Sequence, residues 1–500
     1  MRRFLQAVFV VVALLTSGAR APAAESAQAL LDKNKAFAGW VFGDPAMQGL
    51  RLSGTFGDRK IADLRRGAIW RRTISDPKAG ITYDVGFTGK RFWYTDFNGF
   101  TIPLLSKGMV GYQVAYQVVM NQGIPLLSGT LHGSATVDGM STVIVRVQPP
   151  DGDVIDAYIE PSTGRLARAV IDPDGNDTKI DVLGYADLDG KKIISSWHIS
   201  GPKVVMDKVE HAKIEDSDFH PPAPKSQWTF AAPAPIPITV TKYRIVIRAK
   251  VNGVDGNFIL DSGAGGIAFN PDFATRAKVR NIAPATSFGL TGERKGSVGR
   301  VDTIAVGQNV LHNVLVTNNV NVQSRWSSYD GLLGFDFLAG AIVDVDIAKQ
   351  QMTMFDPAKY AVSAPGPALL VDLVSGTPSV PVTLNGRVKG NFTFDTGAPM
   401  MVVASDDLYG PPRGVEMRLE FYARLGGAGG DASSNSEPAN CGRITSIEIG
   451  TIKYGNVPTC FGDYKIFGHN GGIIGLDFLK QFDLTFDYPD SALYLTPLGK

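Results

Sequence analysis

The chain is poor in the residues that build metal and redox sites. Its 500 residues include two cysteines, Cys441 and Cys460, and six scattered histidines, none at a ligand spacing to either cysteine. A structural zinc site needs four Cys or His ligands, grouped at short intervals. We therefore expect no metal site, and no motif implies an organic cofactor.

The chain also lacks a charge bias and several catalytic signatures. Its formal net charge is +1, which leaves no overall field to attract nucleic acid or an anionic membrane. It has no G-x-S-x-G, no H-E-x-x-H, no phosphate-binding loop and no basic run with interleaved aromatic residues. Serine hydrolases of the elbow type, zincins, P-loop enzymes and nucleic-acid-binding proteins therefore find no support.

Long apolar runs are missing except near the start. Met1-Arg2-Arg3 is followed by an apolar stretch from Phe4 to Leu15 and by the small residues Ala21-Pro22-Ala23. This pattern predicts a signal peptide over residues 1–24, because the run is shorter than the ~20 residues of a membrane-spanning helix. We expect an exported protein, periplasmic or secreted, with no transmembrane segment after cleavage.

In an exported protein, two cysteines at short separation are a candidate disulfide. A disulfide between Cys441 and Cys460 would close a loop of about twenty residues and contribute roughly 3 kcal/mol in the chain-entropy model. Two free thiols are the alternative.

The residues that are abundant predict a mainly β protein. There are 56 glycines and 30 prolines, and short β-branched runs lie between them.

Residues 25–220 form one predicted domain, which starts with a helix around Ala27 to Ala36. Alternating strands follow, with a hairpin over 156–168 whose tip is residues 161–164. In layout this α+β domain is similar to the half-barrels of the lipoprotein-carrier (LolA-like) superfamily, and the resemblance implies a lipid or lipoprotein ligand.

A proline-rich stretch follows this domain. Residues 221–237 contain repeated Pro and Ala, so we expect an extended linker that takes no part in a regular hydrogen-bond ladder.

An internal duplication follows the linker and predicts two lobes, 238–360 and 361–500. The nonapeptide 256–264 (GNFILDSGA) recurs as 390–398 (GNFTFDTGA). Three more blocks recur in the same order: V-N-G with L-N-G before the nonapeptide, then VDTIAVG with ITSIEIG, then GLLGFDFL with GIIGLDFL. A single Asp-Ser-Gly reads equally well as a turn, but a turn does not explain the shared order. Each half is predicted to be mostly strand, with a short helix after each Phe-Leu.

On these residues, 238–497 resembles a single-chain, duplicated retropepsin-like aspartic peptidase, related more distantly to the pepsins. The resemblance implies two β-barrel lobes related by a pseudo-two-fold axis, with Asp261 and Asp395 as the catalytic pair and a polypeptide as substrate. The matching supporting residues are Ser262, Gly263, Thr396 and Gly397 in the catalytic loops, and Leu332, Leu333, Gly334, Ile473, Ile474 and Gly475 in the apolar strands beneath them.

Paired aspartates suit water activation. Two carboxyls about 3 Å apart cannot both ionise easily, so the pair holds one shared proton. One carboxylate then takes a proton from water while its protonated partner polarises the substrate carbonyl. The sequence does not assign which aspartate is the base. Gly263 and Gly397 allow close approach of the loops, and the family implies that the hydroxyls of Ser262 and Thr396 bond across to the facing loop.

Two glycine-rich tips are candidate flaps over the substrate, or simply flexible loops. The first contains Gly289 and Gly292, and the second contains Gly426, Gly427, Gly429 and Gly430. Neither has an evident flap tyrosine, a departure from the pepsins. Asp336 and Asp477 sit at matching repeat positions and are interpreted as helix N-caps.

The leading hypothesis is an exported aspartic endopeptidase. The alternative is a catalytically weak protein of the cell envelope that binds peptides or lipoproteins. Residues 25–220 could also act as an inhibitory prodomain.

Overall fold

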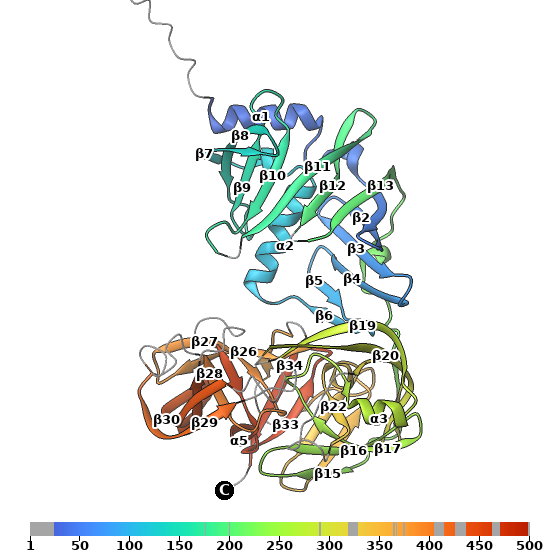
Figure 1. The fold of residues 1–500 in the computed structure, drawn as a ribbon, viewed down its shortest axis with the longest axis vertical. Coiled ribbons are helices and arrows are strands. Elements are labelled where there is room, and N and C mark those ends of the chain that lie inside the picture. The colour runs from blue at the N-terminus through green and yellow to red at the C-terminus, as the bar shows by residue number, and fades with distance from the viewer. Residues whose placement is uncertain are drawn as a thin grey trace, which may run out of the picture.

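The computed structural model describes residues 25–498, except for 176, 200, 290–291, 319–328, 364–365, 367, 374–375, 405–414, 426–436 and 463–470. The predicted signal peptide and the flap glycines Gly426, Gly427, Gly429 and Gly430 lie outside the described residues. The fold is mainly β, with an N-terminal sheet domain above a two-lobed β-barrel region (Figure 1). Within the described part, no helix has the length and apolar character needed to cross a membrane.

The N-terminal domain is one antiparallel sheet with the order β6-β5-β4-β3-β2-β1-β13-β12-β11-β10-β9-β8-β7. Strands that are consecutive in sequence are adjacent in the sheet, except that β6 and β7 lie at its opposite edges and β1 pairs with β13. The strands are β1 Leu50–Phe56, β2 Arg59–Arg66, β3 Ile69–Asp76, β4 Ile81–Phe87, β5 Phe92–Thr95, β6 Thr101–Pro103, β7 Gly129–Val137, β8 Met140–Val147, β9 Ile155–Ile159, β10 Leu166–Ile171, β11 Thr178–Leu188, β12 Lys191–Ile199 and β13 Lys203–His211. The predicted hairpin over 156–168 is β9–β10.

Two helices pack against this sheet, α1 Ala27–Ala38 and α2 Lys107–Met120, along with the short 3-10 turns η1 Pro45–Met47, η2 Ile124–Leu126 and η3 Asp216–Phe219. The side chain of Ser26 caps α1 by accepting a hydrogen bond from the Ala29 N–H at 3.1 Å. Gly39, at φ 74°, ends the same helix in the left-handed conformation. Leu30, Leu31 and Trp197 belong to the buried core between helices and sheet.

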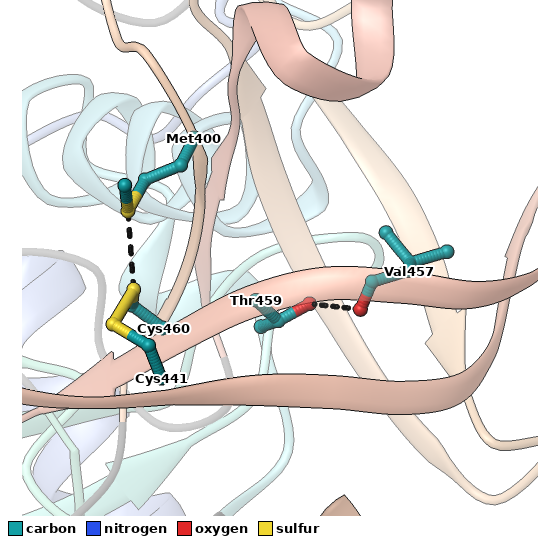
Figure 2. Close-up of a disulfide and its surroundings, with 5 residues drawn as sticks. All are labelled: Met400, Cys441, Val457, Thr459 and Cys460. Atoms are coloured by element: carbon teal, nitrogen blue, oxygen red, sulfur yellow. Dashed lines mark hydrogen bonds between the residues drawn. A yellow bond between two sulfur atoms is a disulfide. The ribbon is translucent and has the colours of Figure 1, made fainter. Parts of the chain in front are cut away.

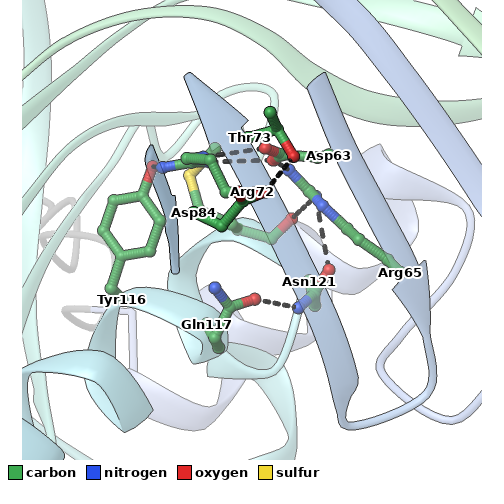
Figure 3. A network of polar contacts seen from close by, with 9 residues as sticks. Asp63, Arg65, Arg72, Thr73, Asp84, Tyr116, Gln117 and Asn121 are labelled. Atoms are coloured by element: carbon green, nitrogen blue, oxygen red, sulfur yellow. Dashed lines mark hydrogen bonds and ion pairs between the residues drawn. The ribbon is translucent and has the colours of Figure 1, made fainter. Parts of the chain in front are cut away.

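A buried charged network fastens α2 to the sheet (Figure 3). Asp63 on β2 accepts hydrogen bonds from Arg65 and Arg72, and Arg72 also donates to the hydroxyl of Tyr116 on α2. Although burial raises the pKa of Asp63, the two guanidinium groups outweigh burial and lower it to about 2. The carboxylate therefore stays ionised, because its partners compensate for lost hydration.

We expected the proline-rich stretch to be a linker that takes no part in a hydrogen-bond ladder, and this expectation is wrong. Within it, β14 Gln227–Thr229 pairs with β21, and β15 Ile236–Val240 pairs with both β16 and β24. Proline removes only its own N–H, so the residues between the prolines still supply donors to a sheet. This segment is thus built into the first lobe.

The first lobe contains β15 to β24, and β14 pairs with its β21. Its remaining elements are β16 Ile245–Val251, β17 Val254–Leu260, β18 Ala268–Phe269, α3 Pro271–Arg276, β19 Arg280–Gly289, β20 Gly292–Val306, β21 Asn309–Asn318, β22 Gly331–Leu333, α4 Phe335–Leu338, β23 Ile342–Asp346 and β24 Gln351–Phe355.

The second lobe repeats this order. Its elements are β25 Leu369–Leu370, β26 Ser379–Leu384, β27 Val388–Phe394, β28 Met401–Ala404, β29 Met417–Leu425, β30 Glu437–Ile449, β31 Ile452–Gly462, β32 Gly472–Ile474, α5 Leu476–Leu479, β33 Phe482–Asp487 and β34 Ala492–Pro497. β23 of the first lobe pairs antiparallel with β33 of the second, and one apolar core runs through both lobes. The lobes are therefore joined by a shared sheet.

Two details of the repeats differ from the sequence predictions. The Phe-Leu pairs lie inside the short helices α4 and α5, whereas a helix after each pair was predicted. The N-caps of these helices are Gly334 and Gly475, so the interpretation of Asp336 and Asp477 as N-caps is wrong. Both aspartates lie two residues after the N-cap, in the first turn, with their carboxyls available for other contacts.

Candidate active site

Each half of the duplication presents its aspartate just after the inner end of a strand, β17 in the first half and β27 in the second. β17 pairs in parallel with β22, and β27 pairs in the same way with β32. The Asp261 N–H donates to the Leu333 carbonyl at 3.0 Å, and the Asp395 N–H donates to the Ile474 carbonyl at 3.0 Å. These hydrogen bonds fix the backbone position of each aspartate. Their acceptors belong to the predicted apolar strands beneath the loops, Leu332-Leu333-Gly334 and Ile473-Ile474-Gly475.

Four hydrogen bonds lock the loops that carry Asp261 and Asp395 to each other. The Ser262 N–H donates to Oγ1 of Thr396 at 3.1 Å, and the Thr396 N–H donates to Oγ of Ser262 at 3.1 Å. The two hydroxyls then donate across the axis, Ser262 to the Phe394 carbonyl at 2.7 Å and Thr396 to the Leu260 carbonyl at 2.6 Å. Both side chains are fully buried. Because the bonds are reciprocal, neither loop can shift without breaking contacts on both sides.

Glycine is required beside each aspartate. The Gly263 N–H donates to Oδ1 of Asp261 at 3.1 Å, and the Gly397 N–H donates to Oδ1 of Asp395 at 2.8 Å. A Cβ on Gly263 would overlap the carboxyl of Asp395, and one on Gly397 would overlap that of Asp261. Any side chain here would force the two loops apart.

The two carboxyls form one electrostatic unit. They hydrogen-bond to each other, and Asp261 is only 7% exposed. Burial raises the pKa of Asp261 well above its ordinary value, and the negative charge of Asp395 raises it further. Burial also raises the pKa of Asp395. Such a pair retains one proton to higher pH than a lone carboxyl would, and it titrates as a unit.

Two further residues near the pair carry no signal in the repeats. The guanidinium of Arg244, just before β16, lies close enough for its charge to lower the pKa of both aspartates. Tyr488, just after β33, is buried, and its hydroxyl has no hydrogen-bond partner among the described residues. Burial raises the pKa of Tyr488, and the negative charges of the pair raise it further. In the aligned repeats Arg244 corresponds to Thr377, and Tyr488 to Ile347, so neither shows in the duplication.

The first flap candidate lies at a hairpin tip. Gly289 ends β19 and is paired with Gly292, which begins β20. In the second lobe the corresponding hairpin is β29–β30, whose tip lies outside the described residues. Strand β29 lies at the edge of its sheet and exposes three large apolar side chains, Leu419, Phe421 and Tyr422.

The two cysteines are bonded in the structure. Cys441 on β30 and Cys460 on β31 are directly paired residues of neighbouring strands, and their disulfide is buried (Figure 2). Sδ of Met400 lies 3.1 Å from Sγ of Cys460. Met400 follows the second catalytic loop, so the bridge packs against the chain that leaves Asp395. Among the described residues, no group of three or more His, Cys, Asp or Glu side chains is placed to hold a metal ion.

Comparison with known proteins agrees with this geometry. A family model described as aspartyl protease matches the chain twice, over residues 247–337 and 380–478. Each match contains one aspartate of the pair and the apolar strand beneath it. A comparison with curated proteins finds no match. The C-terminal region is therefore similar to aspartyl proteases, as a duplicated unit.

Proposed function

We propose that the protein is an exported aspartic endopeptidase that hydrolyses peptide bonds with water activated between Asp261 and Asp395. The two matches to the aspartyl protease family support a peptidase role. The observation that carries the proposal is the pair itself: two hydrogen-bonded carboxyls, one from each repeat, held by reciprocal bonds between Ser262 and Thr396.

The shared proton sets the chemistry. With one proton between the carboxyls, the ionised group accepts a proton from water as the water attacks the scissile carbonyl carbon. The protonated group donates to the carbonyl oxygen, so a neutral tetrahedral diol forms without a covalent enzyme intermediate. The carboxyl that took the proton from water then donates it to the leaving nitrogen while the other carboxylate takes a proton from a diol hydroxyl, so the C–N bond breaks, a carboxyl group forms and the pair again holds one proton.

Location and the N-terminal domain complete the proposal. The segment 1–24 has the basic start, apolar run and small residues of a signal peptide, which supports export to the periplasm or medium. A mature chain that starts near Glu25 in the native host would agree with it, and recovery of intact Met1 from the cytoplasm would refute it.

The helix-covered antiparallel sheet of 25–220 supports a lipoprotein-carrier type of domain, for which we propose a lipid or lipoprotein ligand.

Cleavage of an unstructured protein across acid to neutral pH tests the dyad. Asp261→Asn and Asp395→Asn each keep the shape of the site but lose the shared acid, so cleavage should fall by at least about 10²-fold. The matched control is Asp255→Asn, which removes an exposed carboxylate of the same lobe. Because the pKa of Asp261 is raised, activity should be lost as pH rises through that value and the shared proton leaves.

Two results would oppose the proposal. Equal cleavage by wild type and both dyad variants would refute the assignment of Asp261 and Asp395. Absence of cleavage by wild type at every pH would instead favour the binding-protein alternative.

A further inference from the structure

One hairpin of the N-terminal domain is inserted into the first lobe. It comprises β5, β6 and the turn between them, residues 92–103, and Figure 1 shows it directly above β19 and β20. Phe100 and Ile102 join the core shared by the two lobes. Asn98 is buried and forms two hydrogen bonds with Leu315 of β21, accepting from its N–H at 2.7 Å and donating to its carbonyl at 3.0 Å. The hairpin is thus a fixed part of the first lobe.

The same turn brings a carboxyl to the back of the active site. Asp96 is held by the Phe100 N–H, which donates to its Oδ1 at 2.6 Å, and its side chain hydrogen-bonds to that of Asp336 on α4. Asp336 is buried, 5% exposed, and its Oδ2 accepts from the Ile267 N–H at 2.9 Å. Ile267 lies six residues after Asp261, at the end of the first catalytic loop. A continuous chain of contacts therefore joins Asp96 to that loop.

The second lobe provides an internal comparison. Asp477 is the repeat counterpart of Asp336, and Met401 is the counterpart of Ile267. The Asp477 side chain also bonds to the backbone of Met401, but its Oδ1 is buried without a hydrogen-bond partner among the described residues. The equivalent carboxyl in the first lobe has its partner in Asp96. The N-terminal domain thus supplies a hydrogen-bond partner for the carboxyl beside the Asp261 loop. Among the described residues, Oδ1 of the corresponding carboxyl beside the Asp395 loop has none.

We propose that Asp96 is a positioning residue of the active site: the N-terminal domain holds the Asp261 loop through the side-chain hydrogen bond between Asp96 and Asp336 and the bond of Asp336 to the Ile267 N–H. The inference rests on the proposed peptidase function, which it extends by giving the N-terminal domain a role in catalysis. Asp96 does not touch the dyad and acts through Asp336 and the backbone at Ile267.

A second contact between the domains concerns the first flap. Ala79 and Ile81, around the turn that precedes β4, form a small apolar cluster with Val298 of β20 and Leu315 of β21. Ile282, Ala283 and Ala285 of β19 pack against it. The N-terminal domain therefore touches the base of the flap hairpin and, through Asp96, the residue on α4 that bonds to the end of the Asp261 loop. None of the described residues of β29 and β30 in the second lobe belongs to this cluster.

Because Asp96 titrates, the stability of the contact between Asp96 and Asp336 depends on pH, and the direction of the pKa shift of Asp96 sets the sign. Burial raises the pKa of Asp96 well above its ordinary value, and the hydrogen bond and charge of Asp336 raise it further, while the N–H groups of Phe100 and Asn98 oppose the shift. Near the same hairpin, Lys225 interacts electrostatically with Asp84 and Arg300. Because the pKa of Asp96 is raised, the docked arrangement is most stable in acid and loses stability as pH rises from about 4 through the raised value.

Amide hydrogen exchange in the full-length protein tests this without using turnover. The measured quantity is the exchange rate of the Ile267 amide divided by that of Ile247, a buried residue of the same lobe whose strand is paired on both sides, each corrected for intrinsic rate, at pH 5 and pH 8. In wild type the ratio should rise by about tenfold between these pH values, the low end for a hydrogen bond to a charged group.

Matched variants separate positioning from general stability. Asp96→Asn keeps a donor for Asp336 at every pH, so its ratio should not change with pH. Asp96→Ala should raise the ratio at pH 5 about tenfold, whereas the exposed control Asp58→Asn should behave as wild type. A wild-type pH dependence that persists in Asp96→Asn, or an Asp96→Ala ratio equal to wild type at pH 5, would overturn the proposal. These outcomes stand apart from cleavage, so a failure of the peptidase proposal is recognised separately.

Discussion

Loss of one hydroxyl between the catalytic loops should have a large effect on stability. Thr396→Ala removes a group that donates to the Leu260 carbonyl and accepts from the Ser262 N–H, at a position with no solvent exposure. A buried polar group left without its partner costs about 1–3 kcal/mol, so two such groups cost roughly 2–6 kcal/mol. Thr396→Ser is the matched control, because it keeps both hydrogen bonds and loses only a methyl group, about 0.8 kcal/mol.

Urea unfolding followed by circular dichroism measures this difference. The alanine variant should unfold at lower urea than the serine variant, by a free energy of at least about 2 kcal/mol. Coincident unfolding curves for the two variants would refute the reasoning, since they would mean that the hydroxyl bridges do not hold the lobes together. Ser262→Ala should repeat the result from the other loop, because the bonds are reciprocal.

Two other perturbations test the second lobe. Cys441→Ser with Cys460→Ser should lower the free energy of unfolding by about 3 kcal/mol, the chain-entropy value for a loop of this length, and an effect that remains under reducing conditions would contradict this cause. Burial raises the pKa of Asp477 to about 6, so the folded state loses stability as pH rises from about 4 to 6. Asp477→Asn should therefore be more stable than wild type at pH 7.5 by about 3 kcal/mol relative to their difference at pH 3.5, in urea unfolding at both pH values. A difference that does not change with pH would show that the carboxyl is not strained by its burial.

Much of the fold followed from sequence pattern. Alternating strands and the helix at Ala27 could be predicted, because strand and helix periodicities are local properties of the chain. The strand pairings of 227–229 and 236–237 were missed, because proline content says nothing about the donors that lie between the prolines. The caps of α4 and α5 were also missed, since a glycine N-cap with no side-chain bond leaves no signature.

The sequence by itself determined that two equivalent loops exist and what they contain. Repetition of strand, aspartate, hydroxyl residue and glycine in a fixed order identifies Asp261 and Asp395 as a pair, because both copies of the fold need the same backbone turn and the same close approach.

Only the tertiary structure decided what surrounds that pair. Arg244 and Tyr488 stand at repeat positions where the other lobe has a different residue, and Asp96 comes from another domain. Burial and the distance between charges set the pKa of a carboxyl, and both depend on how separate segments pack rather than on neighbours in sequence. The duplicated loops are therefore alike in sequence, while their surroundings, and the groups that hold each aspartate in place, are not.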